Sequence, residues 1–453
     1  MTGHYLRNTS ADYITGAVSA CEGIRDSLVL LNGPLGCRFY HSYGTAHNFI
    51  RKSQLWSLRG DIRLEDALDD SLLRSQYYAG TPQIPGTNLR YEDNIFGTRE
   101  QLHRALNDIF AERRYSFFAV IQTPGTSLLG EALEGELDEI SREFGIPYLF
   151  VESPQLSTNA YIGYDETTVR LLKLFLPKQT KKKQTDKRVN LFGFHTYQRH
   201  LEGDLAEITR LLRLCGIEVN CAMGTNSSLD SIRSIPEACA NVFLSPERCC
   251  ETRQYLEGRL DMPSLDCCGM PIGFDQTEKF ILDICNLLQG DPSAALEDNE
   301  KARARAFYHI ARHMGNRGFP KELRYAVEAE YSLLNGYVDY LSGYLGIKPA
   351  AVHALYTQCC DSAKEPLEEK LRRFQSTDAL NREITGVRDV LLLGSANTIM
   401  EVQAYSGNVY GIEIASPSSG QIDVIPKTHL GSCGALFLLE QILNGVRKLQ
   451  AWK

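Results

Sequence analysis

Short apolar runs alternate along the chain with amphipathic stretches of helical length, and this alternation limits the fold more than any other feature. Strand–helix–strand repeats of this kind fold into parallel sheets with helices on both faces. The sequence therefore predicts an α/β protein. The predicted strands are Ser27–Leu31, Ser116–Ile121, Pro147–Val151, Val189–Phe194, Ile217–Met223, Asn241–Ser245, Pro263–Cys267, Leu323–Ala329, Lys348–Tyr356 and Val390–Gly394, and the predicted helices lie near Asp204–Cys215, Arg253–Leu260, Gln276–Leu288 and Ala435–Lys448.

The length of 453 residues exceeds what one hydrophobic core serves, so several domains are expected. We predict three doubly wound (Rossmann-like) parallel-sheet domains, at residues 1–188, 189–310 and 311–453. The basic run Lys178–Arg188 (KQTKKKQTDKR) lies between apolar segments and is interpreted as a solvated linker.

Composition removes several classes of function. A net charge of -8 argues against a nucleic-acid binder, which needs a basic surface. The N-terminal residues show no secretion signal and no stretch is apolar enough to span a membrane, so we expect a cytoplasmic protein. In that reducing compartment the 13 cysteines are expected to be core residues or thiolate ligands rather than disulfides. No GxxxxGK[ST] loop occurs, so any ATP hydrolysis requires a separate protein.

The loop that follows the first predicted strand, Asn32–Cys37 (NGPLGC), is the first candidate site. Ligands of doubly wound sheets bind at loops leaving the carboxyl ends of strands, and Gln122–Ser127 (QTPGTS) is the second such loop. Gly33 and Gly36 allow a tight turn and a close backbone approach, and Pro34 stiffens it. Near a helix N-terminus the thiolate of Cys37 would be favoured, which suits an iron–sulfur ligand. A tight turn with a half-buried cysteine is the alternative.

Several motifs, in order and spacing, resemble component 1 of the nitrogenase family, which includes nitrogenases, their cofactor-assembly scaffolds and the dark protochlorophyllide reductase. The resemblance covers nearly the whole chain, and the middle motifs are most similar to the β subunit. The motifs are Gly16-Ala17, Leu30–Cys37, Gly130-Glu131, Phe192–Tyr197, Thr252–Glu257, Met262-Pro263, Pro271–Phe280 and Gly431–Ala435.

The resemblance implies a cluster site with fewer ligands than a nitrogenase β subunit provides. Of that subunit's three cysteine positions for the eight-iron P-cluster, the first is Asp12 here, the second is Cys37 and the third is Pro124. Proline cannot bind a metal. The expectation is therefore a four-iron cluster shared with an α-type partner, with Cys37 as thiolate ligand and Asp12 as a possible oxygen ligand. The B-type subunit of the dark protochlorophyllide reductase similarly contributes one ligand, an aspartate, at the position of Cys37. Cys21 is a rival ligand, with core packing as its alternative.

The resemblance also implies a role and partners. Ser245 occupies the position of the α-type cysteine that binds the catalytic cofactor, so this chain is not expected to anchor an iron–molybdenum-type cofactor. The expected function is that of a β-type subunit of a nitrogenase-like oxidoreductase, in a heterotetramer with an α-type subunit. Electrons would come from an ATP-hydrolysing iron protein. The alternatives are a scaffold for metal-cofactor assembly and a docking subunit without a cluster. The substrate is not predicted.

Other cysteines and histidines have simpler interpretations. Adjacent cysteines point in different directions on a strand or a helix, so the three Cys-Cys pairs are interpreted as core residues. These pairs are Cys249-Cys250, Cys267-Cys268 and Cys359-Cys360. His309 and His313 have a spacing that can bind zinc, but no third ligand is evident, so they are interpreted as a surface feature of a helix.

Overall fold

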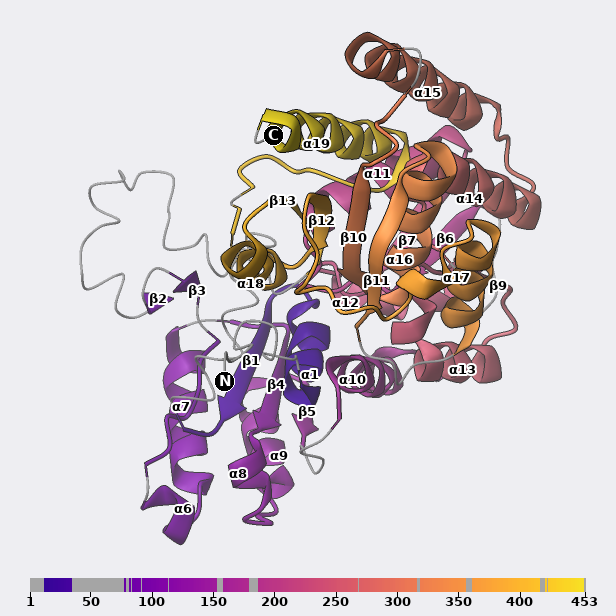
Figure 1. Cartoon of the computed structure of the whole chain (residues 1–453). Helices are drawn as coiled ribbons and strands as arrows, with labels where there is room; N and C mark the ends of the chain where they lie inside the picture. Colours follow the sequence, from indigo (N-terminus) through magenta and orange to yellow (C-terminus); the bar gives the residue numbers. More distant parts are fainter. Residues whose placement is uncertain are drawn as a thin grey trace, which may run out of the picture.

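Three parallel sheets, each from a different third of the chain, form the framework of the part that the structure describes (Figure 1). The structure is a computed structural model. The predicted α/β class with parallel sheets is confirmed, whereas the domain boundaries at 188 and 310 stay a prediction. The described residues are 12–34, 77–78, 81–82, 84–90, 92–112, 114–152, 158–178, 186–267, 269–315, 318–355, 361–415, 420–421 and 423–451.

The first sheet has the strand order β1-β4-β5 and is covered on both faces. Along β1, Val29 and Leu31 pack with α1 and α10, whereas Leu28 and Leu30 pack with α7 and α9. Successive side chains of a strand point to opposite faces, and this sheet buries both faces of β1 and β4, so these two strands are apolar between their ends. The elements are α1 (Tyr13–Glu22), β1 (Ser27–Asn32), the short pair β2 (Tyr77–Tyr78) and β3 (Thr81–Pro82), α6 (Asp93–Phe96), α7 (Arg99–Glu112), β4 (Phe117–Gln122), α8 (Pro124–Ser127), α9 (Glu134–Phe144), β5 (Tyr148–Val151) and α10 (Ala160–Phe175).

The second sheet has the order β7-β6-β8-β9, with β6 and β8 in its interior. β6 starts at Arg188, and residues 179–185 of the predicted linker lie outside the described residues. The elements are β6 (Arg188–Phe192), α11 (Leu201–Leu214), β7 (Glu218–Ala222), α12 (Leu229–Arg233), η2 (Ile235–Glu237), β8 (Ala240–Phe243), η3 (Pro246–Arg248), α13 (Cys250–Arg259), β9 (Ser264–Asp266), α14 (Gly273–Leu288) and α15 (Ser293–Met314).

The third sheet has the order β11-β10-β12-β13, and every pairing in it is parallel. The elements are β10 (Arg324–Ala329), α16 (Tyr331–Val338), the π-helical turn η4 (Asp339–Tyr344), β11 (Lys348–Ala354), α17 (Asp361–Arg373), η5 (Thr377–Ala379), β12 (Val390–Gly394), α18 (Ala396–Ser406), β13 (Val409–Glu413) and α19 (Gly431–Ala451).

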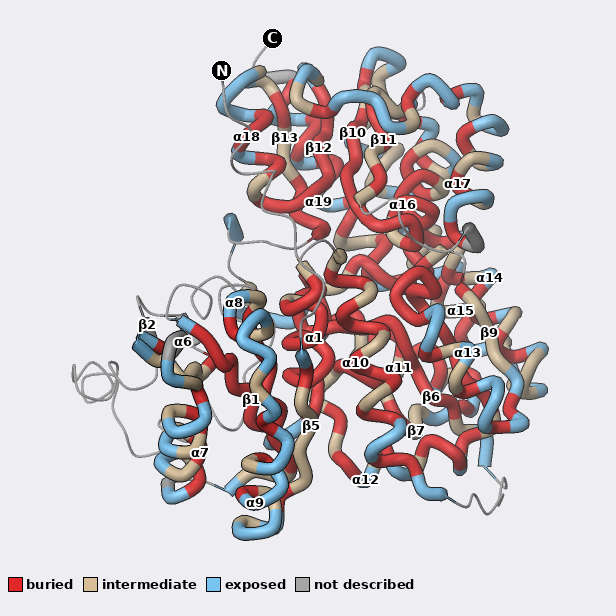
Figure 2. Tube along the Cα trace, turned by 90° about the horizontal axis from the view of Figure 1, so that it is seen from below, coloured by how far each residue is buried: buried red, intermediate tan, exposed pale blue. Residues whose placement is uncertain are grey.

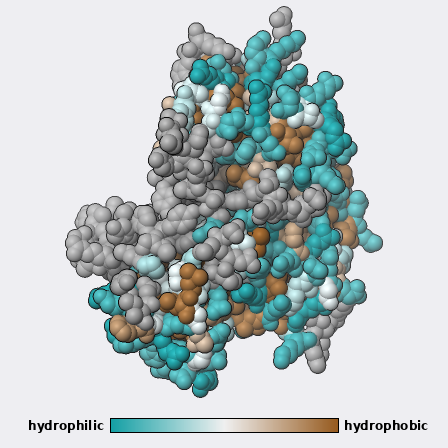
Figure 3. All heavy atoms as spheres, turned by 60° about the horizontal axis from the view of Figure 1, so that its bottom comes forward, coloured by the Kyte–Doolittle hydropathy of each residue, from teal (hydrophilic) through white to brown (hydrophobic). Residues whose placement is uncertain are grey.

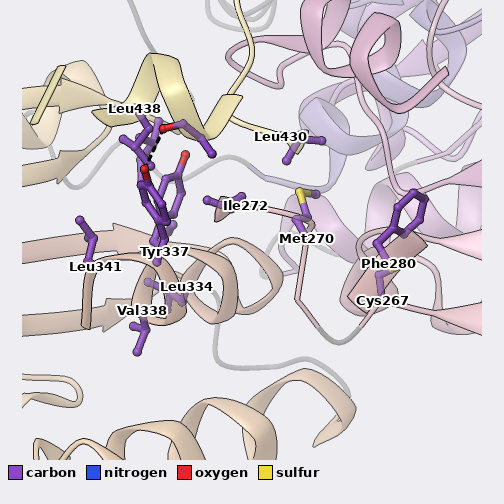
Figure 4. Packing of buried hydrophobic residues seen from close by; sticks show 14 of the residues in the cluster. Cys267, Met270, Ile272, Phe280, Leu334, Tyr337, Val338, Leu341, Leu430 and Leu438 are labelled. Atoms are coloured by element: carbon purple, nitrogen blue, oxygen red, sulfur yellow. Dashed lines mark hydrogen bonds between the residues drawn. The ribbon is translucent and has the colours of Figure 1, made fainter. Parts of the chain in front are cut away.

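One hydrophobic core joins the second and third sheets. Figure 4 shows part of it, where Met270 and Ile272 approach Leu430 and where Tyr337 packs beside Leu438. A second core joins the α1–α10 face of the first sheet to the second sheet. Helix α1 lies inside this core and is buried along nearly its whole length (Figure 2). A helix that is apolar on all sides has no exposed face to show a helical period, which suits its place between two sheets.

None of the helices within the described residues is long and apolar enough to cross a membrane.

Candidate functional site

The first two strand-end loops lie side by side at the carboxyl edge of the first sheet. Asn32 at the end of β1 is in register with Gln122 at the end of β4. The carbonyl oxygen of Asn32 accepts hydrogen bonds from Thr123 N (3.1 Å) and from Thr126 Oγ1 (2.8 Å). A Cβ atom at Gly33 would lie 2.3 Å from Thr123 Cγ2, so only glycine permits this approach. Gly33 thus has a packing role that fits its prediction as a loop residue.

The predicted cluster loop is described in part. Gly33 and Pro34 are described, whereas Gly36 and Cys37 lie outside the described residues. The assignment of Cys37 as a thiolate ligand therefore stays a prediction. Pro124 is the first residue of α8, where its missing N–H costs nothing.

The side chain of Asn32 organises the start of this loop, and the sequence prediction missed it. Its Nδ2 donates to Thr98 Oγ1 (3.1 Å), and its Oδ1 accepts from Thr87 Oγ1 (2.9 Å). Thr87 Oγ1 also accepts from Gly33 N at 3.0 Å. Asn32 has no exposed surface. The only signal in the sequence was a polar residue closing the apolar run SLVLLN.

Glu131, from the Gly130-Glu131 motif, stabilises the start of α7. One carboxylate oxygen accepts from Thr98 N at 2.9 Å and the other accepts from Thr98 Oγ1 at 2.6 Å. An anionic acceptor at a helix N-terminus binds amides that have no partner within the helix. Since Thr98 also contacts Asn32, Glu131 is connected through one side chain to the end of β1.

Asp12 lies at the same edge, because α1 runs back along β1 and begins near the strand's carboxyl end. Its Oδ1 accepts from Thr15 N (2.9 Å) and Thr15 Oγ1 (2.8 Å), so this oxygen caps α1. Asn159 caps α10 in the same way and forms a β-bridge with Asp12. The site thus receives two capped helix N-termini.

The crossing of α1 and α10 depends on two glycines. A Cβ atom at Gly16 would lie 2.0 Å from the carbonyl oxygen of Ala160, and one at Gly163 would lie 2.0 Å from that of Tyr13. Both contacts are with backbone atoms, which no side-chain rotation relieves. The Gly16 of the Gly-Ala motif therefore fixes the position of the helix that carries Asp12.

Cys21 lies in the last turn of α1, at the opposite end from Asp12. It has no exposed surface and belongs to the core between the first and second sheets. This placement favours core packing, the alternative to its prediction as a ligand.

The side chains that could bind a metal determine which cofactor the described part of this edge can bind. Among the described residues, no group of three or more His, Cys, Asp or Glu side chains is arranged to bind a metal ion. Asp12 is the predicted ligand that the structure places at the edge. Such a set fits an iron–sulfur cluster only if Cys37 and a partner protein supply the thiolates.

A second polar cluster lies where the three sheets approach one another, at the ends of β8 and β10. Arg248 Nε donates to Glu330 Oε2 at 2.9 Å, and its guanidinium lies 4.1 Å from the ring centroid of Tyr161. Glu247 accepts from Ser332 N at 2.8 Å, at the start of α16. Burial, with Glu330 nearby, raises the pKa of Glu247 to about 7.

Two further residues belong to this junction. Asp165 of α10 accepts from Glu251 N (2.7 Å) and Thr252 N (2.9 Å), and so caps α13 across the boundary between the first and second sheets. His195 lies 3.9 Å from Glu330, and burial lowers the pKa of this imidazole, followed by the effect of Arg248. The cluster joins the sheets through ion pairs and helix caps.

The remaining cysteines and histidines resemble packing features where they are described. Cys249 and Cys267 are buried, as predicted for core residues. The prediction is wrong for Cys250, whose side chain is exposed at the solvent-facing start of α13. Cys268, Cys359 and Cys360 lie outside the described residues. On α15, the rings of His309 and His313 stack against each other with centroids 6.1 Å apart. Ser245, at the position of the α-type cysteine, has no exposed surface.

Comparison with known proteins establishes the class to which this fold and site belong. The model of the nitrogenase component 1 type oxidoreductases matches residues 14–446. The chain therefore belongs to the nitrogenase component 1 family, as the sequence motifs predicted.

The relatives differ in role. The nitrogenase iron-molybdenum cofactor biosynthesis protein NifE of Clostridium pasteurianum is 24% identical over 314 residues, or 67% of this chain and 60% of NifE. The B subunit of the light-independent protochlorophyllide reductase of Prosthecochloris aestuarii is 28% identical over 210 residues, or 45% of this chain and 38% of that protein. Less than two thirds of either relative is therefore matched. One relative is part of a reductase and the other is a biosynthesis protein, so family membership alone does not assign an activity.

A solved structure shows the same fold over nearly the whole chain. Nitrogenase Cp1 at pH 6.5 superposes with a TM-score of 0.73 and 14% sequence identity, covering 97% of this chain and 92% of that one. This similarity of fold confirms the predicted fold class, parallel-sheet domains of the nitrogenase component 1 type.

Proposed function

We propose that the chain is the β-type subunit of a cytoplasmic, nitrogenase-like reductase complex. Its α-type partner would make most of the contacts to the substrate or catalytic cofactor. A separate ATP-hydrolysing iron protein would supply electrons. The observation that carries the proposal is the carboxyl edge of the first sheet. There the Asn32–Pro34 loop, Pro124 and Asp12, which match the family's cluster positions, come from separate elements to one edge.

At this edge Cys37 and, as an oxygen ligand, Asp12 would hold this chain's share of an iron–sulfur cluster, with the other ligands from the partner. Such a cluster supplies one-electron transfer. The chain's own residues fix where the ligands stand. Asn32 and Glu131 hold the strand end and α7, and the Gly16 contact holds α1.

Exposed apolar side chains beside this edge support a partner there. Phe96 is 86% exposed and Leu128 is 79% exposed. Phe96 precedes Gly97, where a Cβ atom would lie 2.4 Å from Glu131 Oε1, and Leu128 lies three residues before Glu131. On the face shown in Figure 3, hydrophobic atoms gather in small patches between larger hydrophilic areas. Large exposed apolar side chains favour a protein interface where they form a contiguous patch.

The proposal is tested by Cys37→Ala in the anaerobically purified complex. The wild-type complex should contain about four irons for each αβ pair, and the variant should lose most of this iron and the reducible spectroscopic signal. The control is Cys250→Ala, which changes an exposed cysteine at the start of α13 and should leave iron unchanged. Unchanged iron and unchanged signal in Cys37→Ala would overturn the proposal, and a wild-type complex without iron would instead indicate a docking subunit.

The relationship to NifE supports a second candidate, a scaffold on which a metal cofactor is assembled. The NifE match covers 67% of this chain, more than the 45% matched by the reductase relative. A scaffold would release its metal cluster to an apo-acceptor protein and would reduce no substrate. Turnover of a substrate with the iron protein and ATP, without loss of iron, would favour the reductase.

A further inference from the structure

A group of charged side chains lies outside the sites described above, at the carboxyl edges of the second and third sheets; Arg199, His200 and Glu413 are buried, and Asp423 and Lys427 are partly buried. Arg199 and His200 come from the loop between β6 and α11, and Glu413 ends β13. Asp423 and Lys427 belong to the segment that precedes α19. The side chains of Arg199 and His200 are 3% and 6% exposed.

Three nitrogen-bearing side chains surround one carboxylate in this group. Asp423 lies 3.1 Å from Arg199 Nη2, 3.2 Å from His200 Nδ1 and 2.9 Å from Lys427 Nζ. Burial alone would raise the pKa of Asp423, but His200, Lys427 and Arg199 outweigh it, and the pKa falls below its ordinary value. Glu413 lies 3.4 Å from Arg199 and is the second anion of the group.

Both donors and acceptors of this group lack hydrogen bonds. Within the described residues, Arg199 Nε and both ring nitrogens of His200 lack a hydrogen bond, and so do both oxygens of Asp423. The ion pairs are therefore short, but their geometry is not that of hydrogen bonds. Buried polar atoms in folded proteins nearly always have partners, so each atom without one needs an explanation, such as strain or a bound water or ion.

Asp204, a neighbouring buried carboxylate, differs from Asp423 in its hydrogen bonding. It accepts from Thr428 Oγ1 (2.7 Å), from Gln198 and from His429 N (3.3 Å). Asp204 thus makes three hydrogen bonds to fixed groups, whereas the contacts of Asp423 are ion pairs with Arg199, His200 and Lys427.

The described part of the segment that carries Asp423 is attached on both sides of this residue. Arg199 donates to the carbonyl oxygen of Gln421 at 3.0 Å, and the carbonyl oxygen of Lys427 packs against Gly203 of α11. Between these points Val424 is 90% exposed and Ile425 is 67% exposed, so the side chains next to Asp423 do not anchor it.

We propose that Arg199, His200 and Lys427 form a binding site for the carboxylate group of a small organic acid, and that the Asp423 carboxylate occupies this site when no ligand is present. Arginine binds carboxylates through a planar fork of N–H groups, and a lysine and an imidazole beside it add charge and a further donor. A ligand carboxylate would form the hydrogen bonds that Asp423 does not form. This site does not depend on the iron–sulfur assignment.

Acetate is the probe, and the purified complex is the sample. The variant Asp423→Asn keeps the side chain's volume but removes the competing charge, so it should lower the apparent Kd for acetate at least tenfold, by calorimetry. Adding Arg199→Gln to this variant should abolish the gain. The control Asp230→Asn changes an exposed carboxylate that pairs with Arg233, and its Kd should equal that of the wild type.

A second measurement keeps the proposal testable if Asp423→Asn is unstable. In the wild-type complex, saturating acetate should displace Asp423 and speed amide hydrogen exchange in residues 423–428. Unchanged exchange, or equal affinity of Asp423→Asn and wild type for acetate, would overturn the proposal. Inorganic phosphate binding as tightly as acetate would also overturn it, because the site would then not be specific for carboxylates.

Discussion

The close crossing of α1 and α10 leads to a prediction about one substitution, Gly16→Ala. The new Cβ would lie 2.0 Å from the carbonyl oxygen of Ala160 and 2.6 Å from Tyr164 N. Carbon–oxygen contacts in proteins are about 3.3–3.6 Å, so the two helices would have to separate by more than about 1 Å. Helix α1 is enclosed between two sheets, which leaves no direction in which it can move freely.

Two opposing effects set the size of the change. Overpacking of a core costs roughly 1–3 kcal/mol. Alanine is favoured over glycine within a helix by about 0.5–1 kcal/mol, which offsets part of that cost. Because both close contacts are with backbone atoms, the cost lies at the upper end of its range, and we expect a net loss of about 2 kcal/mol.

The matched control is Gly258→Ala in α13, where no atom lies within 4 Å of the new Cβ. Here the helix preference acts alone and should stabilise the protein by about 0.5–1 kcal/mol. The same chemical change should therefore have opposite signs at Gly16 and Gly258.

The assay is local amide hydrogen exchange in α1 and α10, since a chain with several domains does not have to unfold in one step. A loss of about 2 kcal/mol corresponds to a roughly 30-fold faster exchange of these helices. Iron content of the anaerobic complex should fall as well, because Asp12 moves with α1. If Gly16→Ala left the exchange of both helices unchanged, the close crossing would not be the constraint described here.

Three predictions concern the polar junction between the sheets. Because the folded-state pKa of Glu247 is raised from 4.5 to about 7, its contribution is fully present below pH 4.5 and is lost as the pH rises to about 7. Glu247→Gln should remove this loss and make the protein more stable than wild type by up to about 3 kcal/mol at pH 8, as measured by unfolding at several pH values. Equal pH dependence of the two proteins would contradict the raised pKa. Asp165→Ala should destabilise α13 by about 2 kcal/mol, because two backbone amides and Thr252 Oγ1 lose their acceptor, and exchange in α13 measures this. An unaffected α13 would show that water replaces the cap. Arg248→Met should cost about 3–5 kcal/mol because Glu330 stays buried without its partner, and adding Glu330→Gln should recover part of that loss. Additive losses in the double variant would show that the two side chains do not act as a pair.

The strands were predictable because burial on both faces gives them a continuous apolar run. SLVLL and VLLLG, for example, lie within β1 and β12. The prediction omitted β13 (Val409–Glu413), an edge strand whose burial is mixed and whose sequence VYGIE contains a glycine and a charge. It also gave no bounds to α15 (Ser293–Met314), the predicted surface helix of His309 and His313, where only three residues are buried.

The site was predictable only in part, for a different physical reason. Glycine and proline in NGPLGC restrict the backbone locally, and a local restriction can be read from neighbouring residues. The partners of Asn32, in contrast, are 55 and 66 residues away in the chain. No local pattern indicates which hydroxyl groups will meet an asparagine once the sheet has formed.

Helix caps connect the three sheets of this fold. Asp165 from α10 caps α13, and Glu247 from the second sheet binds the start of α16 beside the third. Asp165 accepts from two backbone amides and Glu247 from one, so separating the sheets would leave donors without acceptors at both helix starts. Helix α10 also crosses α1 at Gly16, and α1 carries Asp12. The position of Asp12 at the first sheet's edge is therefore coupled, through α10, to the packing of the second sheet. Substitutions at Asp165 should consequently reduce the iron content of the complex, although this residue lies on α10 and not at the cluster loop.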